Sequence, residues 1–475
     1  MTTTDLKLLP RSASAEVGIP ASSVLSLLEG LATAGLELHS LMVVRRGHVA
    51  VEGWWAPYSA ERPHLLYSLS KSFTSTAVGF ALAEGRFTLD DTIVSLLPGH
   101  VPDEVDPAVA TLTVHHLLSM STGHHEDTLE QALCLEPADL VKGFLRVVPQ
   151  EAVGSRHVYN NSCTYVLAAL VQELTGEHLL DYLRPRLLDP LGVGPAHWDN
   201  DMHGNALGFT GLHLGTEAIA AFGQLLLQRG EWHGEQLLPA GWVELATRKH
   251  IDTDLDPATN VDWAQGYGYQ YWMSRQGFRG DGAYGQFCLV VPEQDLVVVT
   301  TACVEDMQAI LTAVWTHLLP ALDTADPDRT SSDGELARRL AGLALPVIDG
   351  ARDGALDGAP GGPVNDQSFV VHEGGELAPL AAGTRIEIRP AGGDGWTITL
   401  VSGESRLVFG CGHRSWVEST PVVARGGWTA PDTFEADLVL IELPHRIRLR
   451  CIDGRAEASW NAPPLSRARL EAHLP

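Results

Sequence analysis

The sequence predicts an α+β domain followed by a smaller all-β domain. Segments with a strand-like pattern lie at both ends of the first part, at 42–53 and 287–300, and helical patterns fill the residues between them. This order favours an α+β domain over an alternating βαβ arrangement. The composition then changes at about residue 323, and strand-like text resumes near 368. A chain of 475 residues has room for roughly three domains.

The two strand-like regions of the first part are expected to be hairpins. Gly47 marks the turn of the hairpin at 42–53, because glycine adopts the backbone conformations that tight turns require. Pro292 separates two apolar runs, 287–291 and 295–300, which form the second hairpin.

Two of the helical stretches have clear ends. The first runs from Phe73 to Glu84 and is followed by Gly85, and the second runs from Thr164 to Thr175 and is followed by Gly176. Glycine after a helix takes the left-handed cap conformation that other residues resist. Both stretches are therefore predicted as helices.

The composition suggests four regions in the chain. They are an N-terminal segment (1–25), the α+β domain (26–322), a linker (323–367) and a β-domain (368–475). Asp, Gly and Pro dominate the linker, which favours irregular conformations. One short helix is expected in it, from Glu335 to about Leu345.

An alternation of polar and apolar residues predicts the strands of the β-domain. Polar and apolar residues alternate in 385–389 and again in 446–451. A period of two with one buried face is typical of antiparallel strands.

The charge of the chain and its targeting signals limit which partners and which location are expected. Acidic residues outnumber basic ones by 59 to 32, and the net charge is −27. Nucleic acids and anionic membranes are therefore not expected as partners, because both attract clustered basic residues. Neither a signal peptide nor a membrane-spanning stretch is recognised, and the six cysteines show no paired spacing. We expect a cytoplasmic protein with reduced cysteines. The sequence leaves its oligomeric state open, and a homodimer is one of the options.

The clearest chemical signal is a serine followed by a lysine. Arginine supplies 28 of the 32 basic residues, so a lysine in a motif is notable. Ser68 and Lys71 share one face of a first helical turn, at the positive end of the helix. A desolvated lysine can deprotonate a serine, whereas arginine stays charged. The alternative is a helix-capping serine beside a solvated lysine.

Two later segments offer partners for this pair. Tyr159 and Asn161 directly precede the second helix, where a tyrosine hydroxyl can relay protons and an amide can hold a carbonyl. Asp281, Gly282 and Ala283 precede the last hairpin, and glycine there lets the backbone approach a ligand. A packed tyrosine and a simple tight turn are the structural alternatives.

The order of these motifs resembles the serine β-lactamase and penicillin-binding-protein superfamily. The text around them agrees over about residues 26–320, including LTVHHLLSMSTG and YNNSCTYVLAALVQELTG. The resemblance is greatest to the class C β-lactamase-related hydrolases, the branch with esterases and 6-aminohexanoate-dimer hydrolases. It implies an antiparallel sheet flanked by helices with an all-helical subdomain, and an appended β-domain.

The resemblance also implies residue roles. Ser68 would be the acylated nucleophile, activated by Lys71, and Tyr159 would relay the proton. Asn161 would hold the substrate. The N–H groups of Ser68 and Ala283 would form the oxyanion hole.

One departure from the family pattern bears on the substrate. β-Lactamases carry K-T-G before the last hairpin, where this chain has Gly280-Asp281-Gly282. The missing lysine argues against efficient binding of a β-lactam carboxylate, although Arg279 is close enough in sequence to restore the charge.

We therefore expect a serine hydrolase for small-molecule esters or amides, with no cofactor and no metal. The histidine pairs at 115–116 and 124–125 lack the spacing of a metal site. Acyl transfer at the same site, β-lactam or D-peptide hydrolysis, and a non-catalytic binding module are the alternatives.

Overall fold

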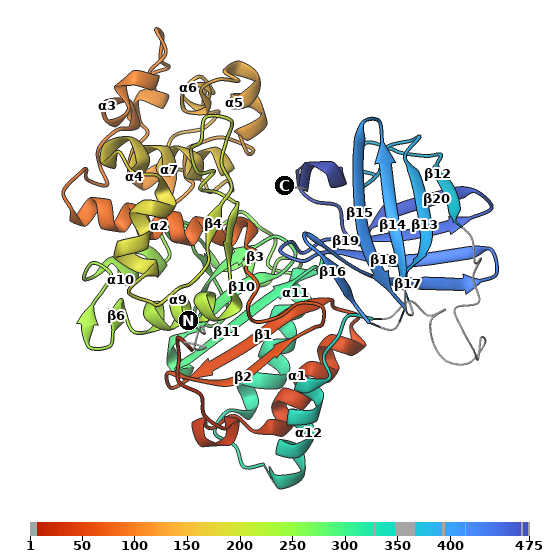
Figure 1. The fold of residues 1–475 in the computed structure, drawn as a ribbon. Coiled ribbons are helices and arrows are strands. Elements are labelled where there is room, and N and C mark those ends of the chain that lie inside the picture. Colours follow the sequence, from red (N-terminus) through yellow and green to blue (C-terminus); the bar gives the residue numbers. More distant parts are fainter. Residues whose placement is uncertain are drawn as a thin grey trace.

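The first part of the chain forms a six-stranded sheet with helices on both faces (Figure 1). The computed structural model describes residues 7–326, 329–346, 366–391, 395–413, 415–466 and 469–473. The sheet order is β2-β1-β11-β10-β9-β8, and every neighbouring pair is antiparallel. The strands are β1 (Leu38–Arg45), β2 (His48–Trp54), β8 (Trp272–Met273), β9 (Phe278–Gly282), β10 (Gln286–Val291) and β11 (Leu296–Ala302).

Both predicted hairpins are confirmed. Strands β1 and β2 meet at a turn in which Arg46 and Gly47 have φ of 52° and 75°. Strands β10 and β11 are joined by a short 3-10 turn that starts at Pro292. The first and last hairpins thus lie side by side in one sheet, because β1 pairs with β11.

Side chains from the two faces of this sheet enter two different cores. One face packs on α1 (Ala21–Thr33) and α11 (Met307–Ala313). The other packs on α2 (Ser70–Ala83) and α9 (Thr216–Leu227). Strands β1, β10 and β11 are buried along their whole length, as expected for a sheet covered on both sides.

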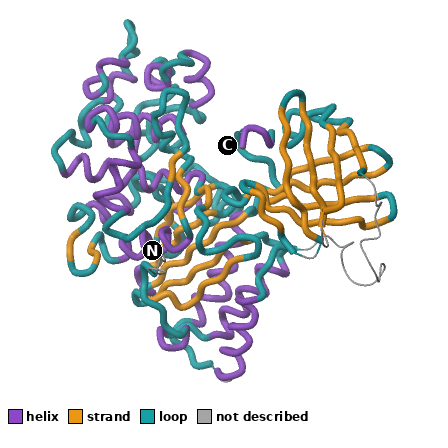
Figure 2. Tube along the Cα trace, in the orientation of Figure 1, coloured by secondary structure: helices purple, strands orange, loops and turns teal. Residues whose placement is uncertain are grey.

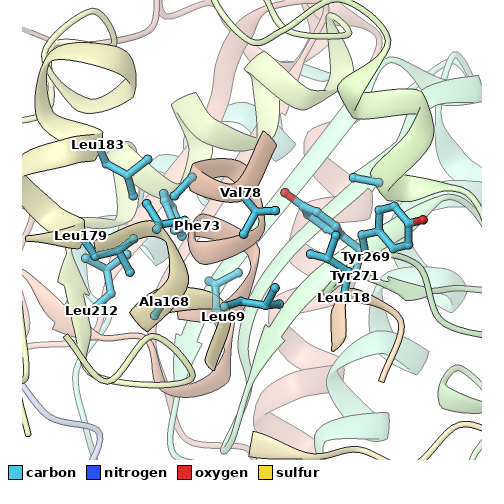
Figure 3. Close-up of a cluster of buried hydrophobic side chains, with 14 of the residues drawn as sticks. Leu69, Phe73, Val78, Leu118, Ala168, Leu179, Leu183, Leu212, Tyr269 and Tyr271 are labelled. Carbon is cyan, nitrogen blue, oxygen red and sulfur yellow. The ribbon is translucent and has the colours of Figure 1, made fainter. Parts of the chain in front are cut away.

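Helix α2 runs through the larger core. Figure 3 shows Phe73 and Val78 of this helix and Leu69 directly before it, with Ala168 and Tyr271 from neighbouring elements. The helix starts at Ser70, three residues before the predicted start, and Gly85 follows it with φ of 72°. Nearly every residue of α2 is buried, which fixes its first turn firmly in place.

A largely helical region lies between α2 and α9, as the resemblance implies (Figure 2). Its longest helix is α7 (Asn161–Thr175), which starts three residues earlier than predicted because the Asn160 side chain caps it, and which ends at left-handed Gly176. The other α-helices of this region and of the segment after α9 are α3 (Ile93–Leu96), α4 (Val114–Leu118), α5 (Leu129–Leu135), α6 (Leu140–Leu145), α8 (Leu179–Leu183) and α10 (Trp242–Thr247). Short strands are β3 (His64–Leu65), β4 (His197–Trp198), β5 (Leu212–Leu214), β6 (Glu231–Trp232) and β7 (Glu235–Gln236).

The helix expected inside the linker is longer and begins earlier. It is α12 (Arg329–Ala341), whereas the prediction was 335–345. Leu336 and Leu340 pack into the core beside α1, so this helix covers the outer face of the α+β domain. Residues 347–365, most of the remaining predicted linker, lie outside the described residues.

The C-terminal region is a barrel-like β-domain. Its strands are β12 (Gln367–Val371), β13 (Arg385–Ala391), β14 (Gly395–Ser402), β15 (Ser405–Gly412), β16 (Val417–Ser419), β17 (Val422–Ala430), β18 (Thr433–Leu440), β19 (Arg446–Ile452) and β20 (Arg455–Trp460). Neighbours are antiparallel except at β12–β20 and β15–β17, which pair parallel. These two pairings bring distant strands together and curve the sheet towards closure.

Polar contacts join the β-domain to the α+β domain. The Arg446 guanidinium donates to both carboxylate oxygens of Glu37, with a shortest distance of 2.7 Å, and Asn461 Nδ2 donates to Glu37 Oε1 at 2.9 Å. The Tyr58 hydroxyl donates to the Leu443 carbonyl at 3.0 Å. None of the helices in the described ranges is long and apolar enough to cross a bilayer.

Candidate active site

Ser68 and Lys71 lie at the start of α2, where a 3-10 turn (Tyr67–Leu69) leads into the helix. Ser68 is partly exposed, whereas Lys71 is only 1% exposed. Because the chain enters the helix at Ser70, the serine hydroxyl sits at the helix N-terminus and the lysine reaches it from the first turn.

The Lys71 ammonium has three oxygen partners. Its Nζ lies 2.9 Å from Ser68 Oγ, 2.7 Å from Asn161 Oδ1 and 2.9 Å from the carbonyl oxygen of Phe209. All three accept hydrogen bonds, and Asn161 belongs to the first turn of α7. The structure thus brings together two predicted site residues that are ninety positions apart.

Burial makes Lys71 easy to deprotonate. It lowers the pKa of Lys71 from 10.5 to about 7, and the negative charges of Asp127 and Asp281 only partly oppose this effect. A buried ammonium loses its hydration, so the neutral amine is favoured. Near neutral pH this amine is therefore available as a base beside a serine hydroxyl.

Tyr159 completes a compact group around the serine. Its ring lies 4.7 Å from Lys71 Nζ and stacks on Trp272 with centroids 5.6 Å apart. Burial raises the pKa of Tyr159 well above its usual range, so the hydroxyl keeps its proton at neutral pH.

Asn161 is held by an aspartate that the sequence analysis did not select. Asn161 Nδ2 donates to Asp127 Oδ2 at 2.6 Å, and Asn161 N donates to Asp127 Oδ1 at 3.0 Å. Both ends of the Asn161 amide thus have protein partners here. Asp127 follows the histidine pair at 124–125, and no local pattern distinguishes it from a surface acid.

Strand β9 passes directly against the 3-10 turn that carries Ser68. A Cβ atom on Gly282 would lie 2.0 Å from the Leu66 carbonyl oxygen, and one on Gly280 would lie 2.6 Å from Ser72 Oγ. At Gly282 only glycine permits this backbone-to-backbone approach, whereas at Gly280 the added atom would meet side chains. Ala283, partly exposed, follows directly at the end of this strand.

The expectation that Arg279 restores a positive charge for substrate is not supported. Arg279 is 0% exposed, and its Nε donates to Asp281 Oδ2 at 3.0 Å. Its guanidinium also lies 4.4 Å from the ring centroid of Trp263 and donates to the Met273 carbonyl. The arginine neutralises Asp281 inside the protein and is shielded from solvent.

The histidine pairs singled out in the sequence do not come together as ligands. His115 Nδ1 lies 2.6 Å from the Tyr269 hydroxyl, and His124 Nδ1 lies 2.8 Å from Thr122 Oγ1. Among the described residues, one other group could offer metal ligands: His197, His213 and Glu442, with ligand atoms within 4.8 Å of one another. Its two imidazoles stack face to face with centroids 3.8 Å apart, whereas a shared metal would lie near both ring planes.

Comparisons with known proteins agree with this architecture. The sequence model of the family described as Beta-lactamase matches residues 29–307, more than half of the chain. The 6-aminohexanoate-dimer hydrolase of Paenarthrobacter ureafaciens is 25% identical over 280 residues, covering 55% of this chain and 71% of that protein. Penicillin-binding protein 4 of Amycolatopsis lactamdurans is 26% identical over 321 residues, covering 59% and 78%.

A solved structure shares the fold. EstCE1, a hydrolase with promiscuous acyltransferase activity, superposes with a TM-score of 0.50 at 16% identity, covering 62% of this chain and 98% of its own. The serine and lysine at the start of α2 lie within the matched residues 29–307, as do the motif of Tyr159 and Asn161 and strand β9. The chain therefore belongs to the Beta-lactamase family, the family of serine hydrolases that its sequence resembles.

Proposed function

We propose that this protein is a serine hydrolase that cleaves esters or amides of small molecules through an acyl-enzyme on Ser68. One observation carries the proposal. A fully buried amine, whose pKa burial lowers to about 7, lies 2.9 Å from a partly exposed serine hydroxyl. A base with a pKa near the working pH combines a useful deprotonated fraction with proton affinity.

Acylation begins with the neutral Lys71 amine. It takes the proton of Ser68, and the serine oxygen attacks the carbonyl carbon of the substrate. Asn161 and the Phe209 carbonyl hold the resulting ammonium, because both present oxygen acceptors to Nζ. An arginine could not perform this step, since a guanidinium does not give up its proton.

The tetrahedral intermediate carries negative charge on the former carbonyl oxygen. The peptide N–H groups of Ser68 and Ala283 are the proposed donors for it. Support comes from the close approach of β9 to the 3-10 turn at Gly282. Fixed backbone donors stabilise developing charge without reorganising during the reaction.

Tyr159 is the proposed acid for the leaving group. Its raised pKa keeps the hydroxyl protonated, so it can donate to the leaving oxygen or nitrogen as the bond to the carbonyl carbon breaks. The Lys71 ammonium then returns a proton to the tyrosine oxygen. In deacylation, water attacks the ester carbonyl of the acyl-enzyme, its proton returns to Ser68 through the same groups, and the acid is released.

The charges near the serine favour substrates without a carboxylate beside the reacting carbonyl. Asp127 is exposed and bonded to Asn161, and Asp281 lies close enough to Lys71 to influence its pKa. Arg279 is buried and paired with Asp281. A β-lactam or a peptide C-terminus would find no exposed cation on β9 to receive its carboxylate, and Asp127 is an exposed acid nearby.

The decisive experiment is intact-protein mass after treatment with a fluorophosphonate. We expect one adduct on the wild type and none on Ser68→Ala. Ser70→Ala is the matched control, because this buried serine of the same motif accepts from the Leu212 N–H and should leave the adduct unchanged. An equal adduct on Ser68→Ala would overturn the proposal.

Turnover assays separate the remaining alternatives. Lys71→Arg should lower ester turnover by roughly a thousandfold, because it keeps the charge and removes the base. Product analysis with an added amine or alcohol distinguishes hydrolysis from acyl transfer. A non-catalytic binding module would show no turnover that depends on Tyr159.

A further inference from the structure

Two tyrosines in an unusual backbone conformation flank the proposed oxyanion donors. Tyr67 precedes Ser68 and has φ of 47°, and Tyr284 follows Ala283 and has φ of 68°. Left-handed conformations are uncommon for such bulky residues and persist only where the surroundings determine them. The question is therefore what holds each tyrosine.

The side chain of Tyr67 is held by a histidine of the β-domain. The Tyr67 hydroxyl lies 2.5 Å from Nε2 of His445, which is 0% exposed and directly precedes β19. His445 Nδ1 lies 2.8 Å from the carbonyl oxygen of Ala462. A carbonyl can only accept, so Nδ1 carries the proton and Nε2 accepts from the tyrosine hydroxyl.

The side chain of Tyr284 is held by the same domain. Its hydroxyl donates to the carbonyl oxygen of Pro463 at 2.6 Å. The Tyr284 ring meets the Tyr67 ring edge-on at 5.6 Å and the His445 ring at 5.1 Å. These three rings form one cluster, which we call the tyrosine clamp: Tyr67, Tyr284 and His445.

A displacement of either tyrosine must reach the neighbouring peptide. Gly282 lies against the Leu66 carbonyl with no room for even a methyl group. Ser68 and Ala283 are each one residue from a clamp tyrosine and belong to these two touching segments. A close-packed contact of this kind transmits small shifts instead of absorbing them.

We propose that the β-domain positions the oxyanion hole of the adjoining hydrolase through the tyrosine clamp, with His445 and the Pro463 carbonyl as its anchors. The proposal rests on the proposed function, since it assigns positioning residues to that reaction. It gives the β-domain a role in catalysis without placing any of its side chains on the substrate.

The test removes single hydroxyl groups from the full chain. Tyr67→Phe and Tyr284→Phe keep the rings and lose the bonds to the β-domain. The matched control is Tyr58→Phe, which also loses a hydroxyl bond to the β-domain, at the Leu443 carbonyl, but does not adjoin the proposed donors. Each variant is assayed with an activated ester and with an arylboronic acid, which forms a tetrahedral adduct on the serine.

We expect kcat to fall about ten- to a hundredfold in both clamp variants, with KM within twofold of the wild type. The affinity for the boronic acid should fall in parallel with kcat, because only the tetrahedral state uses the oxyanion donors. Tyr58→Phe should match the wild type in all three quantities.

Three results would overturn the inference. They are wild-type kcat in both clamp variants, an unchanged boronic acid affinity despite a lower kcat, and an equal loss in Tyr58→Phe. If Tyr67→Phe does not fold, Tyr284→Phe decides alone, because Tyr284 is only partly buried. Full turnover by Ser68→Ala would instead refute the proposed function itself.

Discussion

Replacing Lys71 by methionine should change how the stability of the protein depends on pH. In the folded protein burial lowers the pKa of Lys71 from 10.5 to about 7. Between these two values the unfolded chain binds one proton more than the folded chain. The unfolding free energy therefore rises with pH in this window, by about 1.4 kcal/mol per pH unit.

The size of the effect follows from where the folded pKa lies. Below pH 7 both states hold the proton, and the cost of burying the ammonium is greatest, about 5 kcal/mol. From pH 6 to pH 8, which brackets the folded pKa of about 7, the wild type should gain about 1.4 kcal/mol from this group. Lys71→Met lacks this gain, and its lost hydrogen bonds largely cancel when the two pH values are compared.

Urea unfolding followed by tryptophan fluorescence at pH 6, 7 and 8 measures this difference. Lys249→Met is the matched control, because the side chain of Lys249 is 50% exposed and pairs with Asp252 at the surface. It should follow the wild-type pH dependence. If Lys71→Met also parallels the wild type within about 0.3 kcal/mol, the buried lysine is not easily deprotonated and the assignment of the base fails.

Three further predictions follow from the same geometry. The value of kcat/KM for an uncharged ester should rise with pH through about 7 and then level off, because Lys71 must lose its proton before acylation. A flat profile from pH 6 to 8 would contradict this. Asp281→Asn should lower the unfolding free energy by roughly 3 kcal/mol, because the buried and charged Arg279 then loses its carboxylate partner. Thermal unfolding that matches the wild type would show that the pair is dispensable. Gly282→Ala should abolish ester turnover, since its methyl group would lie 2.0 Å from a backbone oxygen. Gly99→Ala is the control and should be active in the same assay, because a methyl group at this position has no neighbour within 4 Å.

Local patterns predicted those parts of the fold that local chemistry determines. Gly47, Gly85 and Gly176 mark a hairpin turn and two helix ends, and each has a positive φ in the structure. The helix starts were less accurate. Helix α7 begins at Asn161 because the side chain of Asn160 caps it, and asparagine is a residue type that commonly caps a helix start.

The features that sequence reasoning missed depend on contacts between distant segments. Asp127 holds Asn161 from a loop more than thirty residues away, and nothing near it in the sequence reveals that contact. The burial of Arg279 follows from the indole of Trp263 and the carboxylate of Asp281 closing around it. The parallel pairing of β15 with β17 likewise arises from closure of the sheet, which alternation cannot indicate.

Helix α12 has a consequence for how this protein can be divided. Leu336 and Leu340 cover the apolar side of α1, and the backbone N–H of Leu345 donates to the Ala56 carbonyl beyond it. A chain shortened at residue 322 would therefore lose the helix that covers this part of its core. It would expose an apolar surface that favours aggregation. The smallest unit that could be exchanged between related enzymes thus extends to about residue 346. Even that unit would leave the Glu37 carboxylate without Arg446, so a recipient protein must supply a cation at the same place.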